Sequence, residues 1–94
     1  MEYEFDEIKS AANKAKHGLD FSEAQKLRQD VDAVEIPAKS DVEQRKMLIA
    51  RIGGKIWSAI FTERDNKIQI ISVRRTRTNE EAMYEQTEDQ QQES

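Results

Sequence analysis

The segment from residue 45 to residue 77 constrains the fold more than any other part of the chain. Apolar and polar residues alternate through residues 43–52, 55–62 and 67–75, as is typical of β-strands. Gly53 and Gly54 separate the first two runs, and paired glycines favour tight hairpins because their turns need positive φ. Residues 63–66 supply a second turn. The segment therefore predicts an antiparallel meander whose last strand, apolar on both faces, lies inside the sheet.

A helix is predicted before the meander, over residues 6–17. Asp6 is its candidate N-cap, because a carboxylate there accepts hydrogen bonds from first-turn amides, and Gly18 can end it in the left-handed conformation. Helical spacing assigns its buried side to Ile8, Ala11, Ala12 and Ala15. The preceding residues 3–5 allow either a short edge strand or an aromatic lead-in.

A second helix and a further strand are also predicted before the meander. Asp20 and Glu23 have the spacing of a capping box, and the helix they begin is expected to end near residue 29. Residues 31–36 alternate like a strand, and Pro37 is expected to end it because proline cannot donate a hydrogen bond to a sheet ladder.

The last part of the chain is predicted to be a short helix followed by an acidic tail. Residues 78–81 can cap a helix that carries Ala82, Met83 and Tyr84, whereas residues 86–94 are acidic, rich in Gln and expected to be disordered. The pattern indicates one α+β domain over residues 1–85. In it, two N-terminal helices pack on an antiparallel sheet and a short helix ends the domain.

Charge is distributed unevenly along the chain. The net charge is −4, yet residues 45–77 contain nine Lys or Arg side chains and two acidic ones, while residues 80–94 contain six acidic side chains and no basic one. A basic centre between acidic ends is compatible with a local anion-binding surface on a protein that does not bind polyanions indiscriminately. The alternative is that these cations only keep strand edges soluble.

Composition argues against several classes of site. The chain has no cysteine and one histidine, so a disulfide framework and a thiolate zinc site are excluded, and neither a metal nor a cofactor is expected. No apolar run approaches the roughly 20 residues of a membrane helix, and residues 1–6 are acidic, unlike a secretory leader. A cytoplasmic location is expected. Phosphate-binding glycine loops and metalloprotease motifs are absent from the sequence.

The remaining chemistry-bearing side chains are carboxylates, arginines and one imidazole. This set suits metal-independent RNA cleavage, in which the ribose 2′-OH attacks the neighbouring phosphate. The enzyme then needs only to orient the groups, accept a proton and stabilise added negative charge. Arginine forks meet the last need, because they stay charged and match two phosphate oxygens.

Short stretches spread over residues 3–84 agree, in order and spacing, with a known family pattern. They are residues 3–6 (YEFD) with Lys9, residues 13–18 (NKAKHG), residues 21–24 (FSEA), Glu43 with Arg45, residues 62–64 (TER), residues 70–75 (IISVRR) and Tyr84. Together they resemble the BrnT family of type II toxin–antitoxin toxins. The resemblance implies a fold of the RelE ribonuclease kind and a ribonuclease that inhibits translation.

The same resemblance implies a protein partner. BrnT toxins are held inactive by BrnA, a ribbon-helix-helix antitoxin that binds DNA and whose complex represses its own operon. For this chain it implies a cognate BrnA-like antitoxin and an RNA substrate, with DNA contacted only through the antitoxin.

Four residues are candidates for the catalytic groups: Arg64, Arg74, Glu43 and Arg45. Arg64 lies in the turn at the sheet edge, where a guanidinium can reach a phosphate, and strand parity favours Arg74 over Arg75 for the same face. Glu43 and Arg45 share a strand face and suit a proton acceptor and a phosphate clamp. The competing interpretation is a solvated turn residue for Arg64 and a surface ion pair for the other two.

Four further residues are candidates for substrate contacts: Arg75, His17, Lys16 and Trp57. His17 is the one imidazole in the sequence but also suits a helix C-terminus, Lys16 suits a solvated face, and Trp57 suits a core. The sequence also leaves open a different class of function, in which a toxin-like fold docks a partner protein or nucleic acid without catalysis.

Overall fold

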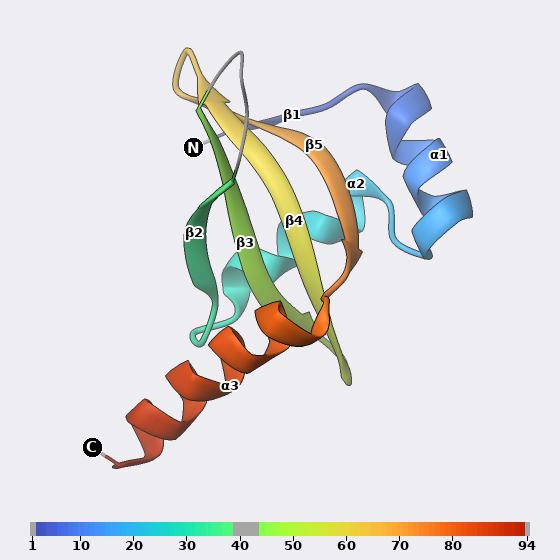
Figure 1. Ribbon diagram of the computed structural model, residues 1–94. Coiled ribbons are helices and arrows are strands. Elements are labelled where there is room, and N and C mark those ends of the chain that lie inside the picture. The colour runs from blue at the N-terminus through green and yellow to red at the C-terminus, as the bar shows by residue number, and fades with distance from the viewer. Residues whose placement is uncertain (1, 39–43, 94) are drawn as a thin grey trace.

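The computed structural model describes residues 2–38 and 44–93, with side chains up to residue 86 in the last helix. One sheet has the strand order β1-β5-β4-β3-β2 (Figure 1). Its strands are β1 (Glu2–Glu4), β2 (Val34–Ala38), β3 (Arg45–Ile52), β4 (Lys55–Arg64) and β5 (Lys67–Arg75). Neighbours are antiparallel except β1 and β5, which are parallel. The α+β class and the interior position of residues 67–75 are confirmed.

Helices cover both faces of this sheet. They are α1 (Glu7–His17), α2 (Phe21–Ala24), the 3-10 helix η1 (Gln25–Gln29) and α3 (Thr78–Glu93). In Figure 1, α2 and η1 lie behind the sheet and α3 crosses in front of it, in contact with β2 and β3. The two sides are called the back face and the front face below. No helix within the described residues is both long and apolar enough to cross a membrane.

The predicted helix boundaries follow from their caps. Asp6 Oδ1 accepts hydrogen bonds from the amides of Ile8 (2.8 Å) and Lys9 (3.3 Å), and Gly18 ends α1 at φ 92°. Both hydrogen bonds of the capping box between Asp20 and Glu23 are present. The second helix continues as η1 to residue 29, as expected, while α3 runs to Glu93, past its expected end near residue 84. The domain boundary at residue 85 stays a prediction.

The meander is confirmed, with one shift at its second turn. Gly53 has φ 61° in the first hairpin, and the second turn is made by Asp65 and Asn66, with φ 53° and 63°. Aspartate and asparagine tolerate this left-handed region better than most residues. Because two residues suffice for the turn, Glu63 and Arg64 belong to β4, and the prediction that they lie in the turn was wrong.

The strand predicted over residues 31–36 is displaced. Val31 and Asp32 form a turn, and β2 spans Val34–Ala38 and includes Pro37, opposite Lys46 of β3. The prediction that Pro37 ends the strand was wrong, because β2 is an edge strand and proline is tolerated where one side of the ladder is unpaired.

The core divides between the two faces of the sheet. On the back face, Phe21, Ala24 and Leu27 of α2 and η1 pack against residues of β3, β4 and β5, including Trp57, Ala59 and Phe61. On the front face, Tyr84 of α3 packs against Ile49 and Ile56. The alternation predicted for β4 is therefore confirmed. A β-bulge between β4 and β5 follows Ile60.

The predicted burial of α1 was wrong. Ser10 and Asn13 are its buried residues, whereas Ile8, Ala11, Ala12 and Ala15 are all exposed. The helix therefore contacts the protein through its polar side. The physical reason lies at the edge of β5 and is developed below.

Candidate functional site

The front face of the sheet carries arginines at both ends. Arg74 lies opposite Ser58, six residues before Arg64 in β4, and alternate residues of β4 share one face. The predicted parity of Arg64 and Arg74 is thus confirmed. At about 3.3 Å per residue, however, the two positions are separated by about 20 Å along the strands. The two ends must be considered separately.

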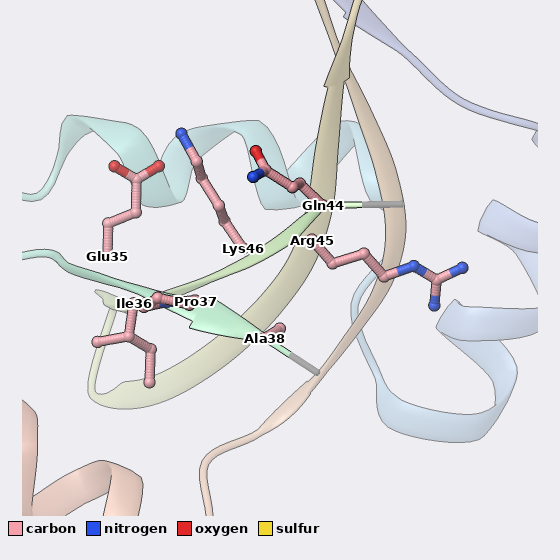
Figure 2. A pocket seen from close by; sticks show the side chains of 7 residues that line it. All are labelled: Glu35, Ile36, Pro37, Ala38, Gln44, Arg45 and Lys46. Carbon is pink, nitrogen blue, oxygen red and sulfur yellow. The ribbon is translucent and has the colours of Figure 1, made fainter. Parts of the chain in front are cut away.

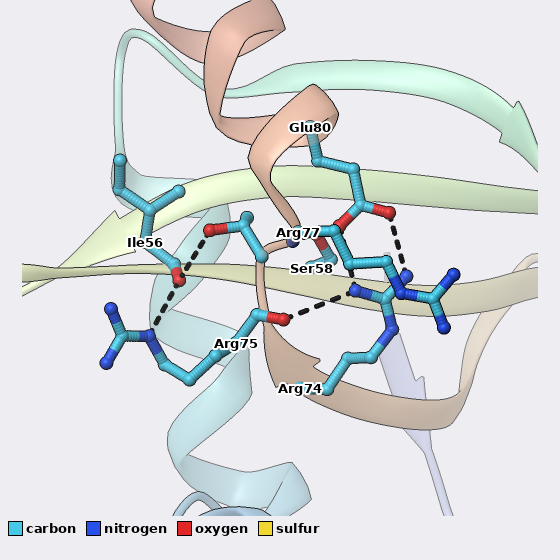
Figure 3. Close-up of polar contacts among 7 residues, drawn as sticks. Ile56, Ser58, Arg74, Arg75, Arg77 and Glu80 are labelled. Atoms are coloured by element: carbon cyan, nitrogen blue, oxygen red, sulfur yellow. Dashed lines mark hydrogen bonds and ion pairs between the residues drawn. The ribbon is translucent and has the colours of Figure 1, made fainter.

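At one end, Arg74 forms a closed ion pair with Glu80 of α3. Its two terminal nitrogens donate to the two carboxylate oxygens at 2.8 Å each, in the arrangement that Figure 3 shows. Glu80 Oε1 also accepts from Ser58 Oγ at 2.8 Å and from the Arg77 amide at 3.0 Å. Glu80 is 5% exposed. A phosphate would have to displace this carboxylate to reach the same fork.

The charges of this pair reinforce each other. The hydrogen bonds from Arg74, together with those from the Arg77 amide and Ser58, lower the pKa of Glu80 to about 2 despite its burial. The hydrogen bond to Glu80 likewise raises the pKa of Arg74. Glu80 lies in the first turn of α3, where a negative charge also suits the helix dipole. The pair therefore fastens α3 to the sheet, and Arg74 is committed to structure.

At the other end of the sheet, a cavity of about 190 Å³ is bordered by Lys9, Arg45 and Arg64. The rest of its lining is Asp6, Gln69, Ile70 and Ile71. Arg45 begins β3, Arg64 ends β4 and Lys9 belongs to the first turn of α1, so three separate elements bring a cation to one place. Lys9 and Arg64 are exposed and Arg45 is half-buried. Such a cavity suits a phosphate group, because cations from several directions can contact its oxygens together.

Lys9 is the cavity cation that the predicted catalytic set missed. Asp6 caps α1 by accepting from the Ile8 and Lys9 amides, which fixes the first turn of the helix beside β5. Because β1 pairs with the start of β5, the chain leaves the sheet edge at that point and brings Lys9 beside Gln69. The cap at Asp6 was readable in the sequence, but the parallel pairing of β1 that places it was not.

A larger cavity, of about 630 Å³, adjoins Arg45 on the side of β2. Its lining includes Glu35, Ile36, Gln44 and Lys46, and Figure 2 shows Arg45 pointing away from Glu35 and Lys46. Glu35 is 3.9 Å from Arg28 of η1 in a weak ion pair, and Lys46 is 3.4 Å from Glu63. The 190 Å³ cavity has three cations to one acidic residue in its lining, Asp6, whereas the larger cavity has two cations to one acidic residue, Glu35. The smaller cavity is therefore the better candidate for an anion.

The candidate substrate-contact residues lie away from the cavity. Arg75 is on the back face, with its guanidinium 5.6 Å from the Trp57 ring centroid and its Nε donating to the Ile56 carbonyl at 3.2 Å. Trp57 is 6% exposed and packs in the core, so base stacking on it is not retained. His17 and Lys16 lie at the far end of α1, about 11–12 Å along the helix from Lys9.

Glu43, the candidate proton acceptor, lies outside the described residues. The neighbouring Gln44 carbonyl accepts a hydrogen bond from Thr62 Oγ1 at 2.7 Å, which ties the start of β3 to β4. This hydrogen bond holds the chain against β4 immediately before Arg45.

The fold and the cavity define a class: a small α+β protein with a cationic cavity at one end of its sheet. A family model described as the ribonuclease toxin BrnT of type II toxin–antitoxin systems matches residues 5–80. This is most of the 94 residues, and the chain therefore belongs to the BrnT family of ribonuclease toxins. A search of curated proteins found no match. Membership implies an RNA substrate and a cognate antitoxin.

Proposed function

We propose that the chain cleaves RNA at the cavity bordered by Lys9, Arg45 and Arg64, without a metal ion. The observation that carries this proposal is the convergence of cations from α1, β3 and β4 on one small cavity. The other basic end of the front face has its arginine paired with Glu80. Of the two ends, the cavity is the one where three cations from separate elements border one space.

The proposed reaction is transesterification within the RNA strand. The ribose 2′-oxygen forms a bond to the adjacent phosphorus while the bond from phosphorus to the 5′-oxygen breaks, leaving a 2′,3′-cyclic phosphate and a 5′-hydroxyl. One proton leaves the 2′-OH and one reaches the 5′-oxygen. Arg45 and Arg64 stabilise the charge that gathers on the phosphorane oxygens, and Lys9 adds a third positive charge. Glu43 remains a candidate proton acceptor.

Two residues support this site from outside the reacting atoms. Asp6 positions Lys9 by holding the first turn of α1 through its hydrogen bonds to the Ile8 and Lys9 amides. Arg74 positions α3 through Glu80 and is not proposed to contact RNA. The catalytic set is thereby reduced from the predicted arginines to Arg45 and Arg64, with Lys9 added.

The biological setting that we propose follows the family. RNA cleavage inhibits translation, the partner is a BrnA-like ribbon-helix-helix antitoxin, and the chain meets DNA only through that antitoxin. Expression of the chain alone should arrest growth, and co-expression with the antitoxin of its operon should restore it.

The chemistry is tested with purified protein and a synthetic RNA in EDTA. We expect cleavage that yields 2′,3′-cyclic phosphate and 5′-hydroxyl ends, and a single 2′-deoxy nucleotide at the cleavage position should block it. Cleavage of the deoxy-substituted strand, or a requirement for added Mg²⁺, would contradict the mechanism. Tight RNA binding without any turnover would instead favour the non-catalytic role.

A further inference from the structure

Helix α1 packs on the protein through its polar side. Asn13 is 8% exposed, and its Nδ2 donates to the carbonyls of Leu19 (2.7 Å) and Val73 (2.8 Å) while its Oδ1 accepts from the Val73 amide at 3.2 Å. Ser10 Oγ accepts from the Phe21 amide at 2.9 Å. Both buried residues of α1 therefore serve backbone groups.

The short length of β1 explains this arrangement. β1 pairs with β5 only from Lys67 to Gln69, so the outer edge of β5 beyond it needs another partner for its backbone groups. The Asn13 amide supplies both a donor and an acceptor to Val73, as a neighbouring strand would. A strand edge needs polar contacts rather than apolar ones, and α1 turns its polar side inward to provide them.

The apolar side of α1 consequently faces solvent. Ile8 is 82% exposed, and three alanines that share its side of the helix are exposed as well: Ala11, Ala12 and Ala15. Their spacing makes one continuous strip about 10 Å long. In Figure 1, α1 lies at the β5 side of the molecule, with its outer side directed away from the sheet. Small side chains along such a strip allow another helix to approach closely.

Positive charge borders this strip along one flank. Lys9 and Lys16 are both exposed, and at 100° per residue they lie within about 20° of each other around the helix, next to Ala12. On the opposite flank, Lys14 is paired with Glu23 at 2.6 Å, so its charge is already matched. The surface formed by Ile8, Ala11, Ala12 and Ala15, with Lys9 and Lys16 beside it, is called the α1 outer surface below.

We propose that the α1 outer surface is the docking site for an amphipathic helix of the cognate antitoxin. That helix would present small or apolar residues to Ile8 and the alanines, and acidic residues to Lys9 and Lys16. A second copy of the chain fits less well, because antiparallel packing on this strip sets Lys9 of one copy beside Lys16 of the other. The proposal rests on membership of the toxin family, which supplies the antitoxin.

Docking on this surface is coupled to the proposed cleavage site through Lys9. The same side chain borders the cavity that Arg45 and Arg64 share. Acidic residues of the antitoxin that contact Lys9 therefore lie beside the cavity. There they repel an RNA phosphate and form an ion pair with one of the three cations. Binding at α1 and inhibition of cleavage would thus be one event.

The test measures binding of the antitoxin encoded in the native operon, purified with the chain, separated and identified by mass. Ile8→Asp adds a negative charge and removes the largest apolar contact, while an acidic residue in the first turn suits the helix. We expect Ile8→Asp and Ala12→Asp each to raise the Kd about tenfold or more. Val31→Asp is the matched control, because Val31 is 88% exposed in the turn before β2. It should bind like the unmodified chain.

A charge variant separates the two parts of the proposal. Lys16→Glu lies outside the cavity and should weaken the antitoxin complex and reduce the salt dependence of its Kd. Unchanged antitoxin binding by Ile8→Asp and Ala12→Asp would overturn the proposal. The proposal would also be overturned if the free chain self-associated and Ile8→Asp abolished this, or if the uncharged variant Ile8→Ser weakened RNA binding.

Failure of this proposal can be told apart from failure of the proposed cleavage site. Binding of the antitoxin is measured without RNA, and therefore does not depend on which residues cleave it. In the absence of antitoxin, Ile8→Ser, which removes the apolar contact without adding a charge beside Lys9, should cleave RNA at the rate of the unmodified chain, but more antitoxin should be needed to inhibit it. Restored inhibition at the normal antitoxin concentration would contradict docking on α1.

Discussion

The two ends of the front face hold similar side chains in opposite circumstances. At one end, Arg74 is bound by Glu80, which also accepts hydrogen bonds from Ser58 and from a backbone amide. At the other, Arg45 and Arg64 border one cavity with Lys9. The difference teaches that the number of basic residues along a strand does not identify a phosphate site. What matters is where the fold places each cation: Arg74 in a bidentate ion pair that fastens α3, and Arg45 and Arg64 at the border of one cavity.

The largest effect that separates the two ends is expected at Arg64. Arg64→Ala should lower the rate of RNA cleavage by about 10²-fold or more, as loss of one preorganised oxyanion donor typically does. The melting temperature of the Arg64→Ala variant should barely change, because the Arg64 side chain is exposed at the end of β4. Arg77→Ala is the control at the other end, since it retains the amide that donates to Glu80. Equal cleavage losses in both variants would break the comparison.

Glu80 is expected to affect stability rather than chemistry. Glu80→Gln removes the charge that pairs with half-buried Arg74, and should lower the free energy of unfolding by about 2–3 kcal/mol in a denaturant titration. Glu81→Gln, at an exposed neighbouring position of α3, should stay within about 0.5 kcal/mol of the unmodified chain. If Glu80→Gln instead cleaved RNA faster per folded molecule, this would indicate that Arg74 contacts the substrate.

The same pair predicts how stability depends on pH. The pKa of Glu80 is lowered from an ordinary 4.5 to about 2 in the folded chain, chiefly by Arg74, so its contribution is complete above pH 4.5 and lost as the pH falls toward 2. The stability advantage over Glu80→Gln should therefore shrink by about 2 kcal/mol across that window. Urea titrations of both proteins at several pH values measure it. An advantage that persists at pH 2 would show that the carboxylate charge is not responsible.

A smaller effect is expected where α3 meets the turn after η1. The Tyr84 hydroxyl donates to Asp30 Oδ2 at 2.6 Å, and this bond, with the amides of Asp32 and Arg51, outweighs burial and lowers the pKa of Asp30. Tyr84→Phe should cost about 1 kcal/mol of stability. It should also increase amide exchange in α3 without changing the cleavage rate. A loss of cleavage would mean that the position of α3 matters at the cavity.

The parts of the fold that local rules determine were predictable. Alternation defined β4 and β5, the pair Gly53-Gly54 defined the first hairpin, and Asp6 and Asp20 defined two helix starts. In each case the residues that decide the structure lie within a few positions of one another. Strand parity likewise placed Arg64 and Arg74 on one face.

The parts that depend on distant pairing were not predictable. Asn13 is buried because β1 is too short to cover Val73. The residues near Asn13 in the sequence do not indicate how long β1 is. The pairing of Arg74 depends on α3 folding back over Ser58. Lys9 reaches the cavity because β1 pairs in parallel with β5. In all three, a long-range contact overrode what the local pattern indicated.

The most direct test of the account asks which arginines an RNA strand contacts. A short RNA with 2′-O-methyl riboses cannot undergo the proposed attack, and it can be titrated into ¹⁵N-labelled protein while the arginine side-chain Nε–H signals are followed by NMR. We predict saturable shifts for Arg45 and Arg64, with little change for Arg74. Shifts concentrated on Arg74, with Arg45 and Arg64 unmoved, would contradict the account.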